Sequence, residues 1–287
     1  MTLKSISQLY NGLCLTVKEH VHQKTPLSEF LIDYSGITAT STGKVGEFIG
    51  QEKYSGYIGD LSEEGDIHIL ITKVSGMLLK LMLIQKMKLE EADIYTSKTI
   101  QNSIEHLILQ MNRLTVREQE QLSKYIGEER WNDLVNRLNI GLINSFSAYE
   151  DSMMDRALWL FQIINFRRTK EWKWFRYRSC IRNQEIKAEI NQLSKRGVDR
   201  MMEIISNEES PKVDLFPYIG HQGEIIVEPD LKINDKVFLI SSNSKSLKKP
   251  KYIAVLNAIQ LLSSETGVEV NEKYIYCIRW DQLLKIS

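Results

Sequence analysis

The sequence predicts an α+β protein with a mainly helical N-terminal portion and a small mixed C-terminal domain. Three observations lead to this expectation. Seven of the fifteen glycines lie between Gly36 and Gly65, which is typical of loops and hairpins. Apolar residues then recur at spacings of three and four as far as about Asn207. After Pro211, short β-branched and aromatic runs alternate with turn residues.

Length and composition are those of a globular chain. The protein has 287 residues, of which 43% are hydrophobic and 26% are charged. Its three cysteines, Cys14, Cys180 and Cys277, are odd in number and far apart, so they do not form a disulfide framework. The N-terminus also lacks the pattern of a secretory signal. We therefore expect a cytoplasmic protein.

One stretch, Ile67–Met87, is apolar enough to suggest a membrane segment. A spanning helix needs ~20 mostly apolar residues. Here the charged side chains of Lys73, Lys80 and Lys86 interrupt the run. We expect a buried strand followed by a buried helix, and no association with a membrane.

The N-terminal portion is expected to cover residues 1–207. Apolar spacing predicts a helix over residues 4–23, and Pro26 opens a new segment. Phe30–Tyr34 is a short apolar run that we interpret as a strand, the first of several short strands near residues 30–72. Helices are then expected as far as about residue 207.

The C-terminal domain is expected to cover residues 208–287. Strands are predicted at 213–219, 224–227, 236–240 and 274–280, with a helix at 252–262. Turn residues such as Pro229 and Asn234 separate the strands. A barrel-like closure is one form that we expect for this domain, by analogy with other small domains and without any functional meaning.

The most concentrated chemical feature is Phe166–Arg182, here called the basic–aromatic segment. Residues 167–182 contain seven Lys or Arg and one Glu, a local formal charge of +6 in a chain of net charge zero. On a helix of 100° per residue, Arg167, Arg168, Arg178 and Arg182 share one arc beside an apolar stripe. The spacing therefore predicts a helix with a cationic flank.

This flank suits a polyanion. Guanidinium groups bind two phosphate oxygens at once, and aromatic rings among them can stack on unpaired bases. The nucleic-acid-binding residues predicted here are Arg167, Arg168, Lys170, Trp172, Lys173, Arg178 and Arg182. Two other interpretations stay open: an acidic protein surface as the partner, or a core helix whose arginines lay their stems over apolar surface and pair with acids elsewhere.

A second basic patch lies between Lys245 and Lys251, in a loop predicted between a strand and a helix. Lys248 and Lys249, next to Pro250, are the residues of this patch that we expect to contact nucleic acid. A solvated loop would have the same composition. The nucleic-acid hypothesis is stronger if the two patches converge in space.

Catalytic motifs match poorly. Gly36–Val45 has six residues between its glycines and a valine after the lysine, so it lacks the spacing and hydroxyl of a phosphate-binding loop. Asp214, Asp230 and Lys232 have the residue types of a metal-dependent nuclease, but Asp-x-Lys is common by chance. The histidines and cysteines show no ligand or nucleophile pattern. We predict no catalytic residues, metal or cofactor.

The sequence therefore predicts a non-enzymatic nucleic-acid-binding component of a larger assembly, which binds the phosphate backbone through a basic–aromatic helix. One alternative is a metal-dependent nuclease that uses Asp214, Asp230 and Lys232. The other is a protein-interaction subunit with an acidic partner. Salt-dependent binding to nucleic acid separates the first hypothesis from the third.

Overall fold

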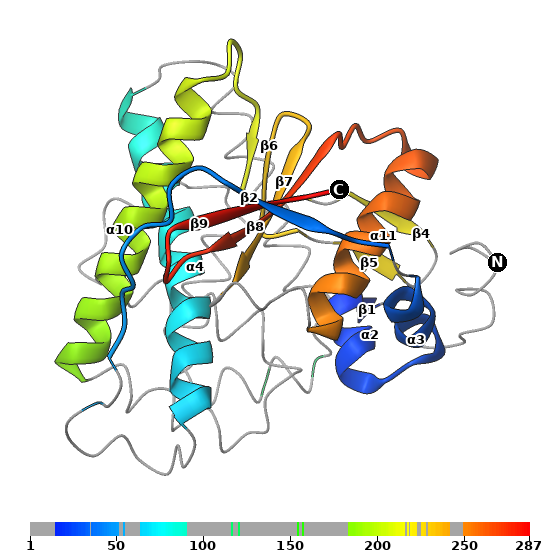
Figure 1. Ribbon diagram of the computed structural model, residues 1–287, viewed down its shortest axis with the longest axis horizontal. Helices are drawn as coiled ribbons and strands as arrows, with labels where there is room; N and C mark the ends of the chain where they lie inside the picture. Colours follow the sequence, from blue (N-terminus) through cyan, green and yellow to red (C-terminus); the bar gives the residue numbers. More distant parts are fainter. Residues whose placement is uncertain are drawn as a thin grey trace. The chain divides into compact units, whose positions relative to one another are not determined.

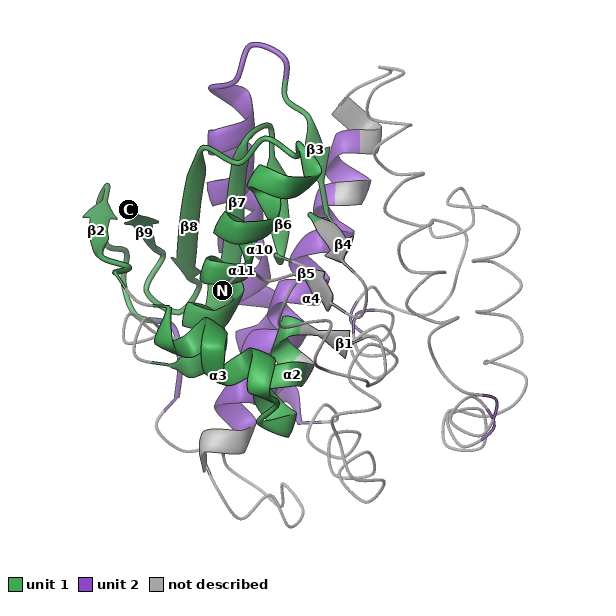
Figure 2. Cartoon of the chain, turned by 90° about the vertical axis from the view of Figure 1, so that its right-hand side faces the viewer, with its two compact units in different colours: residues 1–48, 211–287 green, residues 49–210 purple. Residues whose placement is uncertain are grey.

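The computed structural model is an α+β fold, which confirms the predicted fold class (Figure 1). It describes residues 15–34, 36–51, 54, 64–90, 116, 120, 154, 157, 183–215, 217, 219–222, 225–227, 229–241 and 249–287. The chain divides into two compact units. Unit 1 comprises residues 1–48 and 211–287, and unit 2 comprises residues 49–210 (Figure 2).

Unit 1 is built on a six-stranded sheet with the strand order β2-β9-β8-β7-β6-β3. The strands are β2 (Ala39–Thr42), β3 (Val213–Asp214), β6 (Leu231–Ile233), β7 (Lys236–Ser241), β8 (Glu272–Cys277) and β9 (Gln282–Ile286). β7 and β8 are parallel, and each other neighbouring pair is antiparallel. The expected barrel-like closure is wrong, because β2 and β3 lie at opposite edges of an open sheet.

The crossover between the parallel strands β7 and β8 contains helix α11 (Pro250–Thr266). Pro250 stands in the first turn, where a missing N–H costs nothing because no helical carbonyl would receive it. Gly267, with φ of 71°, ends the helix in the left-handed conformation that glycine adopts without strain. The β6–β7 hairpin turns at Asn234, whose φ is 52°.

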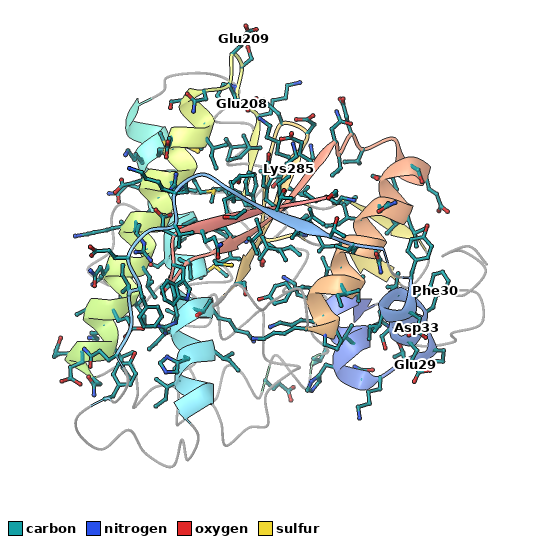
Figure 3. The ribbon with its side chains drawn as sticks, in the orientation of Figure 1. Glu29, Phe30, Asp33, Glu208, Glu209 and Lys285 are labelled. Carbon is teal, nitrogen blue, oxygen red and sulfur yellow. The ribbon has the colours of Figure 1, made fainter. Side chains whose placement is uncertain are left out.

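The core of unit 1 lies between one face of the sheet and three helices. α11 packs there with α2 (Val17–Gln23) and α3 (Pro26–Asp33). The sheet contributes Val237, Leu239, Ile275, Cys277, Leu284 and Ile286 to this core. α3 is amphipathic: Leu27 and Leu31 are fully buried, whereas Glu29 and Asp33 are exposed on its outer side (Figure 3). Burial of these apolar side chains is the main term that stabilises the unit.

A three-stranded sheet, in the order β1-β5-β4, completes the described part of unit 1. Its strands are β1 (Leu15–Thr16), β4 (Gly220–Gln222) and β5 (Ile225–Val227). β1 pairs with β5 in parallel, so the N-terminal segment joins residues more than 200 positions later. The boundary predicted near residue 208 lies close to Pro211, where unit 1 resumes, and residues 15–48 pack with the C-terminal residues.

Of two local predictions in the N-terminal part, the strand was wrong and the helix holds for residues 17–23, with residues 4–14 outside the described part. The strand expected at Phe30–Tyr34 is the second half of α3 and the residue after it, because Thr25 caps that helix and Pro26 starts it. Thr25 Oγ1 accepts a hydrogen bond from Ser28 N at 3.3 Å. The helix expected over 4–23 begins only at Val17 within the described residues, where β1 precedes it.

Unit 2 contains two long described helices, α4 (Glu64–Glu90) and α10 (Gln184–Ser206), which pack on each other. Ser194 Oγ of α10 lies 3.1 Å from the carbonyl oxygen of Ser75 in α4, so small residues stand at this contact. The strand expected before residue 72 was wrong, since α4 is one continuous helix. Its window Ile67–Met87 is long and apolar enough to cross a membrane, but 76% of it is buried, as in the core helix of a soluble protein.

Candidate nucleic-acid interface

Most of the predicted interface lies outside the described residues. This holds for Arg167, Arg168, Lys170, Trp172, Lys173, Arg178, Arg182 and Lys248. Lys249 is the predicted contact that the structure describes.

Lys249 occupies the N-cap position of helix α11. Its backbone is extended, with φ of −94° and ψ of 121°, and its carbonyl oxygen accepts hydrogen bonds from Tyr252 N at 3.0 Å and Ile253 N at 3.4 Å. The cap makes no side-chain hydrogen bond to the first turn. A helix of 17 residues thus presents its positive end beside a lysine, and both attract an anion.

Lys251 adds a second cation in the first turn of α11. Its Nζ lies 4.8 Å from the centroid of the Tyr252 ring, a cation–π contact. That ring is held in place because Tyr252 is buried and its hydroxyl donates to the carbonyl oxygen of Ile240 at 3.2 Å. Burial also raises the pKa of the Tyr252 phenol. The Lys251 ammonium group therefore lies over a buried aromatic ring.

The position of Lys249 in the topology also favours a ligand role. It follows the carboxyl end of β7, where Ser241 is paired with Cys277 of the parallel strand β8. In open α/β sheets, ligands bind outside the carboxyl ends of such strands and at the amino ends of the helices that follow. Sequence reasoning selected Lys249 from composition alone; the crossover that surrounds it is visible only in the fold.

Two residues of the nuclease alternative, Asp214 and Lys232, lie on neighbouring strands of one sheet, and Asp230 stands directly before β6. Asp214 of β3 stands opposite Lys232 of β6, so their side chains lie on one face of the sheet. Burial lowers the pKa of Lys232, and the nearby Asp214 carboxylate opposes this shift. The Lys232 ammonium donates to the carbonyl oxygen of Asn234.

The Asp230 carboxylate contacts both helix α2 and strand β7. Its Oδ1 lies 2.9 Å from Lys18 Nζ, and its Oδ2 accepts a hydrogen bond from Ile240 N at 2.8 Å. Within the described ranges, no group of three His, Cys, Asp or Glu side chains is arranged to hold a metal ion. The contacts of Asp230 are those of a residue that fixes the start of β6.

The sequence analysis did not select two residues that contact these candidate residues or stand beside them. Lys251 was recognised as part of the basic patch but not as a contact; its signal was the aromatic residue beside it. Lys18 had no sequence signal, because it reaches Asp230 over 212 positions. Comparison with protein-family models, curated proteins and solved structures found no match for this chain.

Proposed function

We propose that this chain is a non-enzymatic nucleic-acid-binding component of a larger cytoplasmic assembly, and that the basic–aromatic segment binds the phosphate backbone. One observation carries the proposal: residues 167–182 hold a formal charge of +6, with Trp172 and Trp174 among the charges, in a chain of net charge zero. Such segregation of charge creates a local positive field that attracts polyanions.

The amino end of α11 supports the same function. Lys249 and Lys251 stand there beside the positive end of the helix dipole. Phosphate groups are bound at such ends by backbone N–H groups and cations together. Lys248 and Lys249 are proposed as contacts that position the backbone and carry no base specificity.

Fluorescence anisotropy with labelled single-stranded and double-stranded oligonucleotides tests the proposal. We expect binding that weakens steeply between about 50 and 200 mM salt, because each neutralised phosphate releases counterions. Replacement of Arg167, Arg168, Arg178 and Arg182 by Gln should abolish most binding to every sequence. Trp172→Ala should weaken single-strand binding more than double-strand binding, since stacking needs unpaired bases.

A matched control removes four positive charges elsewhere. Lys24, Lys44, Lys195 and Lys212 are exposed, so their joint replacement by Gln changes net charge equally. This control should retain most of the affinity. Equal losses in both variants would show a general charge effect and no interface. Absence of binding at low salt would overturn the proposal and favour an acidic protein as the partner.

A further inference from the structure

The two edges of the unit 1 sheet differ in how they are protected. Exposed edge strands are templates for pairing with another chain, and proteins protect them with prolines, charges or very short strands. β3 is two residues long, carries Asp214, and follows Pro211 and Lys212. β2, Ala-Thr-Ser-Thr, has no charge, no proline and a β-branched residue at every second position. It lacks each of these protections.

The hydrogen bonds to β9 show which groups β2 leaves at its outer edge. Thr38 and Ser287 exchange two backbone hydrogen bonds, 3.4 and 3.1 Å long. Because such pairs alternate along an antiparallel ladder, Thr40 and Thr42 also face β9, in register with Lys285 and Leu283. Ala39 and Ser41 therefore direct their N–H and C=O groups outward, where no described residue accepts or donates to them.

The edge is also accessible and electrically neutral. Thr40 and Ser41 are exposed, and Figure 2 shows β2 as the outermost strand of its sheet. The nearest charge on β9 is Lys285, labelled in Figure 3, which pairs with Glu272 of β8. β2 itself carries no charge, and the nearest charged residue after it is the exposed Lys44, two positions beyond the strand.

From this geometry we propose that β2 pairs with β2 of a second copy of this chain, which joins the two sheets across a two-fold axis. With Thr40 opposite Thr40 of the other copy, Ala39 of each copy faces Ser41 of the other. Both outward residues of each strand are then paired, and four backbone hydrogen bonds form. Antiparallel self-pairing is isologous, so the assembly closes as a dimer.

Side chains fit this register. Thr40 of one copy faces Thr40 of the other in a non-hydrogen-bonded pair, where side chains lie closest. On either side, Thr38 of one copy faces Thr42 of the other. Thr–Thr pairs across strands are favourable. Lys44 falls opposite Gly36, so like charges do not meet. Beyond the strand, the exposed rings of Phe48 and Trp280 have centroids 4.8 Å apart and are tilted by 44° to each other.

Disulfide trapping tests the register in the full chain. The background variant has Cys14 and Cys180 replaced by Ser. In it, Thr40→Cys gives one cysteine per copy, and the Cα atoms of the two cysteines would lie about 4.5 Å apart, within the range that a disulfide spans. Mild oxidation should give covalent dimers. Lys44→Cys is the matched control, since its two thiols would lie roughly 27 Å apart along the strands. Equal cross-linking of both variants would overturn the register.

Sedimentation equilibrium tests the interface without a cross-link. The unmodified chain should form a reversible dimer. Ser41→Pro removes an outward N–H that the β9 ladder does not use, and it should weaken dimerisation ~10-fold or more because two of the four hydrogen bonds are lost. Ser41→Ala keeps the N–H and should dimerise normally. A chain that stays monomeric at high concentration, or a dimer that tolerates Ser41→Pro with unchanged circular dichroism, would overturn the proposal.

Discussion

Lys18 Nζ lies 2.9 Å from Asp230 Oδ1, so one ion pair joins helix α2 to the start of strand β6. The other carboxylate oxygen of Asp230 accepts the N–H of Ile240 in β7 at 2.8 Å. Three elements from opposite ends of the chain thus meet at one carboxylate. Each oxygen has a different partner. Loss of the hydrogen bond and loss of the ion pair should therefore lower the free energy of unfolding by different amounts.

Asp230→Ala should destabilise unit 1 by about 1–3 kcal/mol, because it leaves the half-buried N–H of Ile240 and the ammonium of Lys18 without a partner. Lys18→Met should cost less, about 0–1 kcal/mol, since the pair is partly exposed to solvent. Urea denaturation measures both. Glu265→Ala, which removes an exposed carboxylate, is the control. Equal stability of Asp230→Ala and this control would refute a structural role for Asp230.

Asn257 of α11 should stabilise the C-terminal end of helix α3. Its side-chain amide donates to the carbonyl oxygens of Leu31 and Tyr34, at the end of α3 where carbonyls have no helical partner. Asn257 is 1% exposed, so these carbonyls have little access to water without it.

Asn257→Ala should therefore cost about 1–3 kcal/mol, and Asn257→Asp should cost more because a carboxylate cannot donate. Thermal unfolding followed by circular dichroism measures the difference. Gln260→Ala, on the exposed face of the same helix, should change stability by less than about 0.5 kcal/mol. If Asn257→Asp matched Asn257→Ala at neutral pH, the amide would not be acting as a donor.

The Cys277 thiol should make stability depend on pH in the alkaline range. Burial raises its pKa from 9.0 to about 12, so the folded state keeps the thiol protonated. The unfolded thiol ionises above about pH 9, which favours unfolding. This contribution to stability is therefore complete below pH 9.0 and is lost between pH 9.0 and about 12.

The comparison with Cys277→Ala isolates this effect, because other groups titrate identically in both proteins. The alanine variant loses some stability through the smaller side chain, but that loss does not change with pH. The difference between the two proteins should narrow by about 1.4 kcal/mol for each pH unit above 9. Urea titrations at several alkaline pH values measure it. A constant difference would show that the folded thiol titrates normally.

The sequence allowed the elements with strong local signals to be predicted. Helix α11 contains the helix predicted over 252–262, and the continuous apolar run Val237–Ile240 lies in β7, where a strand was predicted over 236–240. Phe30–Tyr34 was misread because five apolar and acidic residues resemble a strand as much as a helical turn, and the deciding cap, Thr25, lies outside the run. The open sheet was not predictable, because β2 pairs with β9 over more than 200 positions.

The role of Lys249 stays a prediction. It was selected from charge density, which is a local property that needs no knowledge of the fold. Its place at the amino end of α11 depends on the parallel pairing of β7 and β8, which no short motif in the chain encodes. Asp230 illustrates the opposite case: its residue type suggested chemistry, and its partners Lys18 and Ile240 give it a structural role.

Lys249 should contribute to nucleic-acid affinity through charge alone. It has no ion-pair partner among the described residues, and its neighbour is the positive end of α11. Lys249→Gln should weaken binding similarly for all sequences, and the slope of log affinity against log salt should become shallower by about 0.7–0.9, as for one lost phosphate contact. Lys249→Glu should weaken binding further, since a carboxylate repels phosphate.

Lys212→Gln is the control for this measurement. Lys212 is a single exposed cation in unit 1, and it lies outside both basic patches. Its salt slope should match that of the unmodified chain. Thermal stability of Lys249→Gln should also be unchanged, since the cap makes no side-chain hydrogen bond. A shallower slope in Lys249→Gln with an unaltered slope in Lys212→Gln places phosphate at the amino end of α11. If both slopes stayed unaltered, the polyanion would contact the chain elsewhere.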